Sequence, residues 1–283
     1  MSSVRFTDFV AEPSVADIFM YGIPFEGQVN LRKGASVGPQ SIREHSHFIE
    51  TYVPELGKDL EDLQLFDGGD VRISKQPTLE ILDDVARQIA DAIPPGKRCV
   101  FLGGDHTVTY PVLKALAPRW PRLSVIQIDA HADRQDLFPQ EPYNYASVMA
   151  KLLEFIPPSR LFQVGIRTGA RTEYENEFGT HFFPQSQIGF LDAIDKAVAT
   201  AADGPVYVTL DIDALDPTIA PGTGSPEPNG ITFQELKEAV RRLRRLEIVG
   251  FDLVEVSPPF DYSGYTAILA ACIIRDCILN WWG

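Results

Sequence analysis

Two aspartates and a histidine alternate along residues Ile126 to Asp133, which read Ile-Gln-Ile-Asp-Ala-His-Ala-Asp. Asp129, His131 and Asp133 follow an apolar run that predicts the end of a buried strand. If the chain stays extended, side chains two residues apart share a face, and all three project together. Carboxylate and imidazole groups suit Mn, Fe or Zn rather than a metal that prefers thiolates. Taken alone, the stretch is also compatible with an acidic turn after a strand.

Two further clusters of the same residue types follow other apolar runs. His106 closes a Gly-Gly-Asp-His sequence, and Asp211 and Asp213 close a second apolar run. With the first cluster they provide four carboxylates and two imidazoles. Four carboxylates crowded together without cations would repel one another and raise their pKa values, whereas two divalent ions would cancel the four charges. We therefore predict a two-metal site, rather than acids that merely cap helices, and its oxygen-rich ligands favour Mn²⁺ over Zn²⁺.

Such a site has a definite chemistry. Two metal ions about 3.5–4 Å apart can share a water and lower its pKa toward neutrality, which provides a nucleophile without a serine or cysteine. The sequence has no glycine-rich phosphate loop of the P-loop type, and Gly103-Gly104 is too short to count as one. Metal-assisted hydrolysis is therefore favoured over nucleotide chemistry.

The composition narrows the class of protein. The net charge of −14 argues against binding to nucleic acid and would favour a cationic small molecule, although an acidic surface also serves solubility. The N-terminus lacks a signal pattern and no apolar run approaches the length of a membrane span, so we expect a soluble, cytoplasmic protein without membrane contact. The cysteines Cys99, Cys272 and Cys277 lie in apolar segments and are expected to be buried free thiols.

Short apolar strands alternate with helical patterns along the whole chain, which predicts a parallel sheet covered by helices on both faces. The fold class is therefore α/β, a three-layer sandwich with a central, mostly parallel eight-stranded sheet, in a single domain over residues 1–283. The expected strands are 17–23, 63–66, 99–102, 125–128, 161–166, 181–183, 206–212 and 248–256. Sites in such sheets lie beyond the carboxyl ends of the strands. The polar clusters at those ends are Asp70, His106, Asp129 to Asp133, Asp211 to Asp216 and Glu255.

The three clusters resemble the metal motifs of the ureohydrolases, the family of arginase and agmatinase. The matching motifs are Gly103 to His106, Asp129 to Asp133 and Asp211 to Pro217. Further resemblance lies in the early loop Arg32 to Pro39, the loop Ala220 to Pro228 and the late strand Gly250 to Pro258. The resemblance covers nearly all of the chain and implies an arginase-like fold. The short length and the run Ser225 to Pro228 look most like agmatinases.

The resemblance also implies roles for individual residues and two Mn²⁺ ions per chain. One ion would be held by His106, Asp129, Asp133 and Asp211, and the other by Asp129, His131, Asp211 and Asp213. Asp133 would orient the attacking water and pass its proton to the leaving amine. Glu255 would pair with a cationic guanidino small molecule, and Ser225 would offer a hydroxyl nearby. The implied reaction yields an amine and urea, with agmatine to putrescine as the first choice, in a polyamine pathway. The implied assembly is a homo-oligomer, a trimer or hexamer.

One position departs from the family pattern. Members carry a histidine after the second motif, and Tyr145 occupies that place here. Tyrosine can hydrogen-bond to substrate, but its ordinary pKa near 10 makes it a poor proton shuttle at neutral pH. Two alternatives therefore stay open. The chain could act on another guanidino compound, such as guanidinobutyrate, arginine or guanidine, or it could be a weakly active, metal-bound oligomer with a binding role.

Overall fold

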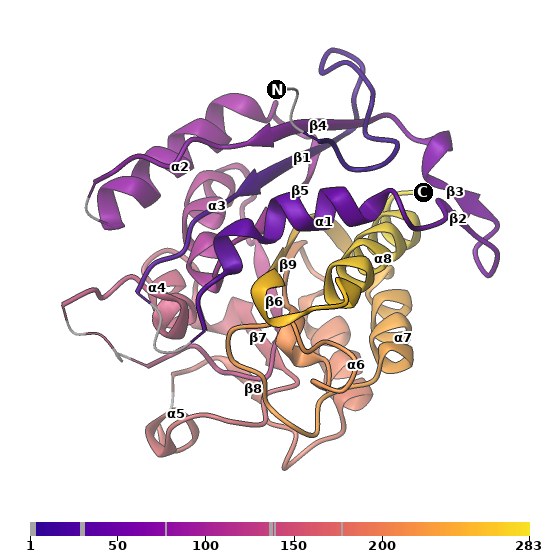
Figure 1. Cartoon of the computed structure of the whole chain (residues 1–283). Coiled ribbons are helices and arrows are strands. Elements are labelled where there is room, and N and C mark those ends of the chain that lie inside the picture. Colours follow the sequence, from indigo (N-terminus) through magenta and orange to yellow (C-terminus); the bar gives the residue numbers. More distant parts are fainter. Residues whose placement is uncertain (1–3, 29–31, 77, 136–137, 139, 177) are drawn as a thin grey trace.

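A computed structural model describes residues 4–28, 32–76, 78–135, 138, 140–176 and 178–283. All eight expected strands are present and form one sheet in the order β4-β1-β5-β10-β9-β6-β7-β8 (Figure 1). Their bounds are β1 Ile18–Ile23, β4 Leu65–Asp70, β5 Arg98–Gly103, β6 Ser124–Ile128, β7 Leu161–Val164, β8 His181–Phe183, β9 Pro205–Asp211 and β10 Glu247–Val254. Every neighbouring pair in this sheet is parallel. The predicted α/β fold is confirmed, and its sheet is parallel throughout rather than mostly so.

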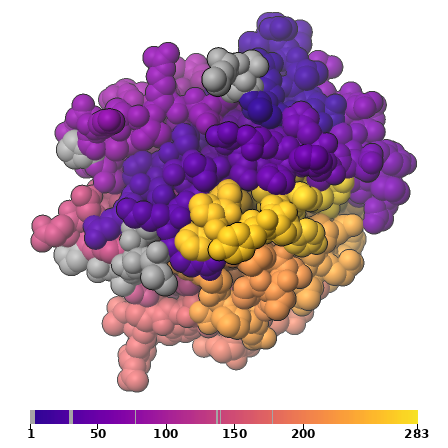
Figure 2. Space-filling view, viewed as in Figure 1, coloured from indigo at the N-terminus to yellow at the C-terminus, as the bar shows by residue number. Residues whose placement is uncertain are grey.

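Helices cover both faces of the sheet, as the near-continuous burial of its central strands requires. One layer consists of α1 (Gly38–Ser46), α6 (Phe190–Ala201), α7 (Phe233–Leu243) and α8 (Tyr265–Trp281), and the other contains α2 (Thr78–Ala92), α3 (Thr109–Leu116) and α4 (Val148–Leu152). Each helix layer packs on one face of the sheet, and a separate hydrophobic core is buried between them. Figure 2 shows α8 in yellow, lying between α1 in purple and α7 in orange. Trp282 belongs to the first core, so the C-terminal tryptophans pack inward.

Local sequence signals explain most element boundaries. The Thr232 hydroxyl accepts a hydrogen bond from the Glu235 amide and the Glu235 carboxylate accepts one from the Thr232 amide, which together form a capping box at the start of α7. Thr78 is the first residue of α2, and its hydroxyl donates a hydrogen bond to Glu141 Oε2. The short hairpin of β2 (Tyr52–Val53) and β3 (Lys58–Asp59) and the helix α5 (Arg171–Glu175) were not predicted.

The order of the strands decides where a site can form. The first three strands of the sheet, β1, β4 and β5, lie side by side, and the next strand in the sequence, β6, lies farther along the sheet. The last two strands, β9 and β10, lie between β5 and β6. Strands β5, β10, β9 and β6 are therefore adjacent at the centre of the sheet. Their carboxyl ends are level, because Val254 pairs with Asp211, Leu253 with Leu102 and Ile128 with Leu210. Segments far apart in the sequence thus meet at one edge.

Candidate metal centre

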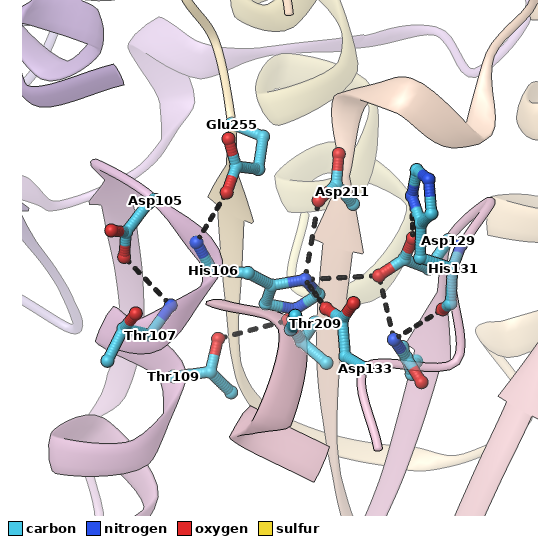
Figure 3. A network of polar contacts seen from close by, with 12 residues as sticks. Asp105, His106, Thr107, Thr109, Asp129, His131, Asp133, Thr209, Asp211 and Glu255 are labelled. Atoms are coloured by element: carbon cyan, nitrogen blue, oxygen red, sulfur yellow. Dashed lines mark hydrogen bonds and ion pairs between the residues drawn. The ribbon is translucent and has the colours of Figure 1, made fainter. Parts of the chain in front are cut away.

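The predicted metal ligands follow three of these central strands, and Glu255 follows the fourth. His106 lies three residues after β5, Asp129 and Asp133 follow β6, and Asp211 ends β9. Figure 3 shows their side chains converging beside Glu255, which follows β10. Gly104 allows the first of these loops to pass the early loop, since a Cβ there would lie 1.8 Å from the Phe25 carbonyl oxygen. The structure therefore brings the three sequence clusters into one place.

The second cluster reaches this place by a turn rather than by an extended strand. Strand β6 ends at Ile128, and beyond it the chain keeps only an isolated bridge between His131 and Thr168. The Asp129 carboxylate accepts a hydrogen bond from the His131 amide at 2.6 Å, and Asp133 has a φ of 52°. The expectation of an extended run is therefore wrong, although its side chains still converge.

His106 stands at the centre of the first group of ligands. Its Nδ1 lies 3.0 Å from Asp129 Oδ2, 2.9 Å from Asp133 Oδ2 and 3.3 Å from Asp211 Oδ2. This nitrogen is buried and makes no hydrogen bond among the described residues. A buried imidazole nitrogen that faces three carboxylate oxygens has the donor set and the position of a metal ligand.

A second group forms around His131 and shares Asp129 with the first. The Nδ1 atom of His131 lies 2.9 Å from Asp213 Oδ2 and 3.7 Å from Asp129 Oδ1. One ligand atom from each of these three residues fits within 4.8 Å of the others, as it does for His106, Asp129 and Asp133. Two adjacent sets of nitrogen and oxygen donors with a common carboxylate match the predicted requirement for two ions.

The acids are crowded strongly enough to shift their protonation. Burial, reinforced by the charge of Asp129, raises the pKa of Asp133 to about 7. Burial, with the charges of Asp213 and Asp129, also raises the pKa of Asp211 well above its usual range. Burial would raise the pKa of Asp129 too, but its contacts with the two imidazoles lower it. Without cations these acids must share protons, and bound metal ions would displace those protons.

Glu255 adds a fifth carboxylate beside the two groups. Its Oε1 accepts a hydrogen bond from the His106 amide at 2.9 Å, and its own amide donates to the Gly104 carbonyl at 2.9 Å. Burial and the charge of Asp105 raise the pKa of Glu255 well above its usual range. A cationic ligand would relieve that cost, because an opposite charge favours the ionised carboxylate.

Asp133 and Glu255 share an unusual backbone conformation. Their φ angles are 52° and 65°, in the left-handed region that residues with a Cβ rarely occupy. Such a conformation costs on the order of 1 kcal/mol and persists only where the surroundings enforce it. The two residues expected to contact substrate thus carry backbone strain at the same site.

A cavity of about 220 Å³ opens above these groups. It is lined by His131, Asp133, Gln135, Tyr145, Ala146, Gly169, Glu173, Asp211, Asp213, Ser225 and Glu255. Tyr145 and Ser225 therefore lie at the wall of the cavity, and their contact with substrate stays a prediction. The Tyr145 ring is half-buried, with its centroid 6.2 Å from that of Phe138.

Gln135 and Glu173 form an outer wall that sequence reasoning missed. Gln135 Nε2 donates to Glu173 Oε2 at 2.5 Å, and the same oxygen accepts from the Ala170 amide at 2.9 Å. Glu173 Oε1 accepts from the Arg134 amide at 3.0 Å. The Gln135 amide donates to the Ala146 carbonyl at 2.7 Å, which ties the Tyr145 turn to this wall.

Buried polar side chains within the strands support the ligands, and these were also missed. Gln127 Nε2 donates to Asp129 Oδ2 at 2.7 Å, and Gln163 Nε2 donates to Gln127 Oε1 at 2.6 Å. Thr209 Oγ1 lies 2.9 Å from His106 Nε2. These residues could have been found in the sequence, because Gln127 and Thr209 are polar residues within apolar runs and each lies two residues before a metal ligand.

Several other polar residues lie outside the centre. Asp70 ends the edge strand β4 and pairs with Arg43 at 2.5 Å, so its expected place among the site clusters is wrong. Asp105 accepts from the Gly27 and Thr107 amides, and Asp216 accepts from the Thr218 and Gly230 amides, so both carboxylates stabilise the loops around them. Ser36 lies in a Gly-x-Ser-x-Gly sequence, but its hydroxyl donates to Glu26 in the early loop.

The chain matches the Arginase family over residues 16–280. It is 38% identical over 269 residues to an agmatinase of Bacillus subtilis, an alignment that covers 94% of this chain and 92% of that protein. The chain belongs to the arginase family. It is 33% identical to the mitochondrial guanidino acid hydrolase of Homo sapiens, over 94% of this chain and 78% of that protein. This arginase-family chain also superposes on a putative agmatinase of Clostridium difficile with a TM-score of 0.89 and 30% identity, covering 95% and 98% of the two chains.

Membership of the arginase family makes the chain a hydrolase and confirms the resemblance drawn from its motifs.

The expected free thiols are present, with Cys99 and Cys277 buried and Cys272 half-buried. Within the described ranges, no helix is both long enough and apolar enough to span a bilayer.

Proposed function

We propose that this arginase-family chain is a manganese-dependent ureohydrolase that converts agmatine to putrescine and urea. The observation that carries the proposal is the cavity floor, where two adjacent groups of His and Asp donors share Asp129 beside the buried carboxylate of Glu255. Relatives named agmatinase support the choice of substrate.

The residues present fit two divalent ions. The unpartnered Nδ1 of His106 faces three carboxylate oxygens, and burial together with neighbouring carboxylates raises the pKa values of Asp133 and Asp211. We assign one ion to His106, Asp129, Asp133 and Asp211, and the other to Asp129, His131, Asp211 and Asp213. Oxygen-rich donors with histidine suit Mn²⁺. When bound, the ions would lower the pKa of a shared water toward neutrality.

The protein's own groups supply the rest of the chemistry. The guanidinium carbon is a poor electrophile because its charge is delocalised, so the substrate must be held firmly against the water. Glu255 is placed to pair with the planar cation, which can form two parallel hydrogen bonds with a carboxylate. Asp133 faces the same cavity, and we assign it to orient the water and carry its proton to the leaving amine.

The charges of the cavity favour a substrate without a negative tail. Two bound ions would neutralise the aspartates of the metal centre and Glu255 would pair with the guanidinium, so Glu173 in the outer wall is the described lining acid left to face the substrate tail. A guanidino acid or arginine would bring its own carboxylate into these surroundings without a lysine or arginine lining the described wall. The amine tail of agmatine meets no such repulsion.

A second candidate is the same hydrolysis on a guanidino acid. The similarity to the human guanidino acid hydrolase supports it, and so does Tyr145, whose phenol could donate a hydrogen bond to a carboxylate tail. The acidic lining weighs against this candidate, so we rank it second.

Urea release from a panel of guanidino compounds tests the proposal. The Mn²⁺-loaded protein is expected to release urea from agmatine with a higher kcat/KM than from guanidinobutyrate, arginine or guanidine, and to yield putrescine in equal amount. A preference for guanidinobutyrate would favour the second candidate. Urea from none of the panel, with two metals bound per chain, would contradict hydrolysis and leave a metal-bound protein with a binding role.

We further propose that residues 1–283 form a single domain, that the protein is cytoplasmic, and that it assembles as a homo-trimer or hexamer. These three proposals rest on the family resemblance and on the one sheet that runs through the described chain. Light scattering coupled to size exclusion tests the assembly, and elution as a monomer of about 31.4 kDa would contradict it.

A further inference from the structure

A fully buried carboxylate lies beneath the metal centre and is only half satisfied. Asp252 is in the middle of β10 with no exposed surface. Its Oδ2 accepts hydrogen bonds from Thr109 Oγ1 at 3.0 Å and from the Tyr207 hydroxyl at 2.9 Å. Its Oδ1 is buried without a hydrogen-bond partner among the described residues. Burying a carboxylate in this way is costly, so its place in the sheet needs an explanation.

A chain of hydroxyl groups links this carboxylate to His106. Thr109 Oγ1 lies 3.2 Å from Thr209 Oγ1, and Thr209 Oγ1 lies 2.9 Å from His106 Nε2. All members of the chain are buried. Figure 3 shows Thr109 and Thr209 joined by a dashed line beside the His106 imidazole.

The number of protons fixes the direction of this chain. A threonine hydroxyl has one hydrogen. Thr109 uses its hydrogen on Asp252, so in its contact with Thr209 it must accept. Thr209 therefore donates to Thr109 or to Asp252 itself, and in both cases it can only accept from His106. A neutral His106 must then carry its proton on Nε2, which leaves the lone pair on Nδ1.

We infer that Asp252 is a positioning residue for the metal centre, which acts through Thr109 and Thr209 to present the Nδ1 lone pair of His106 to the metal. Metal-bound histidines usually donate their other N–H to a fixed acceptor, which sets the tautomer and the ring orientation. Here the acceptor is a threonine whose own direction is imposed by a carboxylate two hydroxyls away. This inference rests on the metal site proposed above and assigns a function to residues outside the cavity.

The sharpest test removes the link without substituting His106 or Asp252. Thr109→Val replaces the hydroxyl with a methyl group of similar size, so Thr209 loses the acceptor that directs its hydrogen away from Nε2 and the competing tautomer is less strongly disfavoured. We expect one of the two metal ions to bind about tenfold more weakly, in the range found when such outer partners are lost. Equilibrium titration with Mn²⁺ against a chelator measures both ions without reference to activity.

Two companion variants separate positioning from packing. Thr109→Ser restores the hydroxyl and is expected to restore the wild-type affinity. Tyr207→Phe removes the other hydrogen bond to the same Asp252 oxygen but leaves the hydroxyl chain intact, and is expected to leave both affinities unchanged. Wild-type affinity in Thr109→Val, or an equal loss in Tyr207→Phe, would overturn the inference.

Failure of Thr109→Val to fold and failure of the wild-type protein to bind Mn²⁺ have different consequences. If Thr109→Val does not fold, Thr109→Ala removes the same hydroxyl with less bulk, and the same tenfold loss is expected, with an unchanged affinity overturning the inference. If the wild-type protein binds no Mn²⁺, the proposed metal site itself fails, which is distinct from a bound metal that ignores Thr109.

Discussion

The two ends of the cavity are built differently. At the inner end the metal ligands and Glu255 follow four adjacent strands, and buried side chains such as Gln127 and Thr209 contact the ligands from within the sheet. At the outer end Tyr145, Ser225 and Glu173 come from loops and short helices, and side-chain contacts such as that of Glu173 with Gln135 tie the wall together. The strands thus position the groups that carry out the reaction, whereas the loops determine which substrate the cavity accepts. Substitutions at the inner end should abolish turnover, and those at the outer end should have smaller effects on KM, turnover or substrate preference.

The largest effect is expected at the shared ligand. Asp129→Asn keeps the shape of the side chain but removes the charge common to both groups, so turnover should fall by about a thousandfold or more, since a metal site supplies several kcal/mol of transition-state stabilisation. Initial urea release and metal content by mass spectrometry measure the two effects. Asp216→Asn is the matched control outside the cavity and should retain both ions. Full activity in Asp129→Asn would refute the proposed role of the inner end.

Glu255→Gln is expected to lower kcat/KM by about a hundredfold, because a buried partner of a cationic group is typically worth a few kcal/mol. The metal content should stay near the wild-type value, since Glu255 belongs to neither donor group. Glu227→Gln, on the loop that carries Ser225, provides the control. Loss of metal from Glu255→Gln would assign this residue to the metal centre instead of the substrate.

At the outer end, Glu173→Gln should raise KM by about tenfold and lower the free energy of unfolding by about 1–3 kcal/mol, because an amide cannot accept from all the donors that now meet the carboxylate. Substrate titration and urea denaturation measure these changes. Glu175→Gln alters an exposed acid on the same short helix and should change neither quantity. An unchanged KM together with unchanged stability would contradict a role for Glu173 in either substrate binding or stability.

The smallest effect is expected at Tyr145. Tyr145→His places an imidazole with an ordinary pKa near 6.5 at the cavity wall, so turnover of agmatine should rise by about threefold to tenfold, less than an optimally placed general acid contributes. Tyr145→Phe keeps the ring and serves as control. A shift in preference among guanidino compounds without faster turnover would make Tyr145 a specificity element, and unchanged kinetics would exclude both roles.

The same contrast explains what could be predicted from the sequence. The eight strands and the ligands are local patterns, namely apolar runs followed by acids and histidines, so they could be read residue by residue. The order of strands is not local, which is why Asp70 was grouped with the site although β4 lies at the edge of the sheet. The turn at Asp133 was missed because the sequence does not distinguish an aspartate with a positive φ from one in an extended strand.

The supporting residues were missed for a different reason. Gln127, Thr209 and Asp252 are single polar residues within apolar strands, and each gains its meaning from a partner on another element. Gln135 and Glu173 are 38 positions apart and meet only in the folded chain. The family resemblance placed Tyr145 and Ser225 at the cavity, whereas the residues that hold the wall in position became visible only in three dimensions.

The central claim is that the inner end of the cavity holds two metal ions with Asp129 between them. Anomalous diffraction from Mn²⁺-loaded crystals, measured near the manganese absorption edge, tests it most directly. The account predicts two peaks per chain, one among His106, Asp129 and Asp133 and one among Asp129, His131 and Asp213. A single peak remote from Asp129, or none in crystals that hold Mn²⁺ elsewhere, would contradict it.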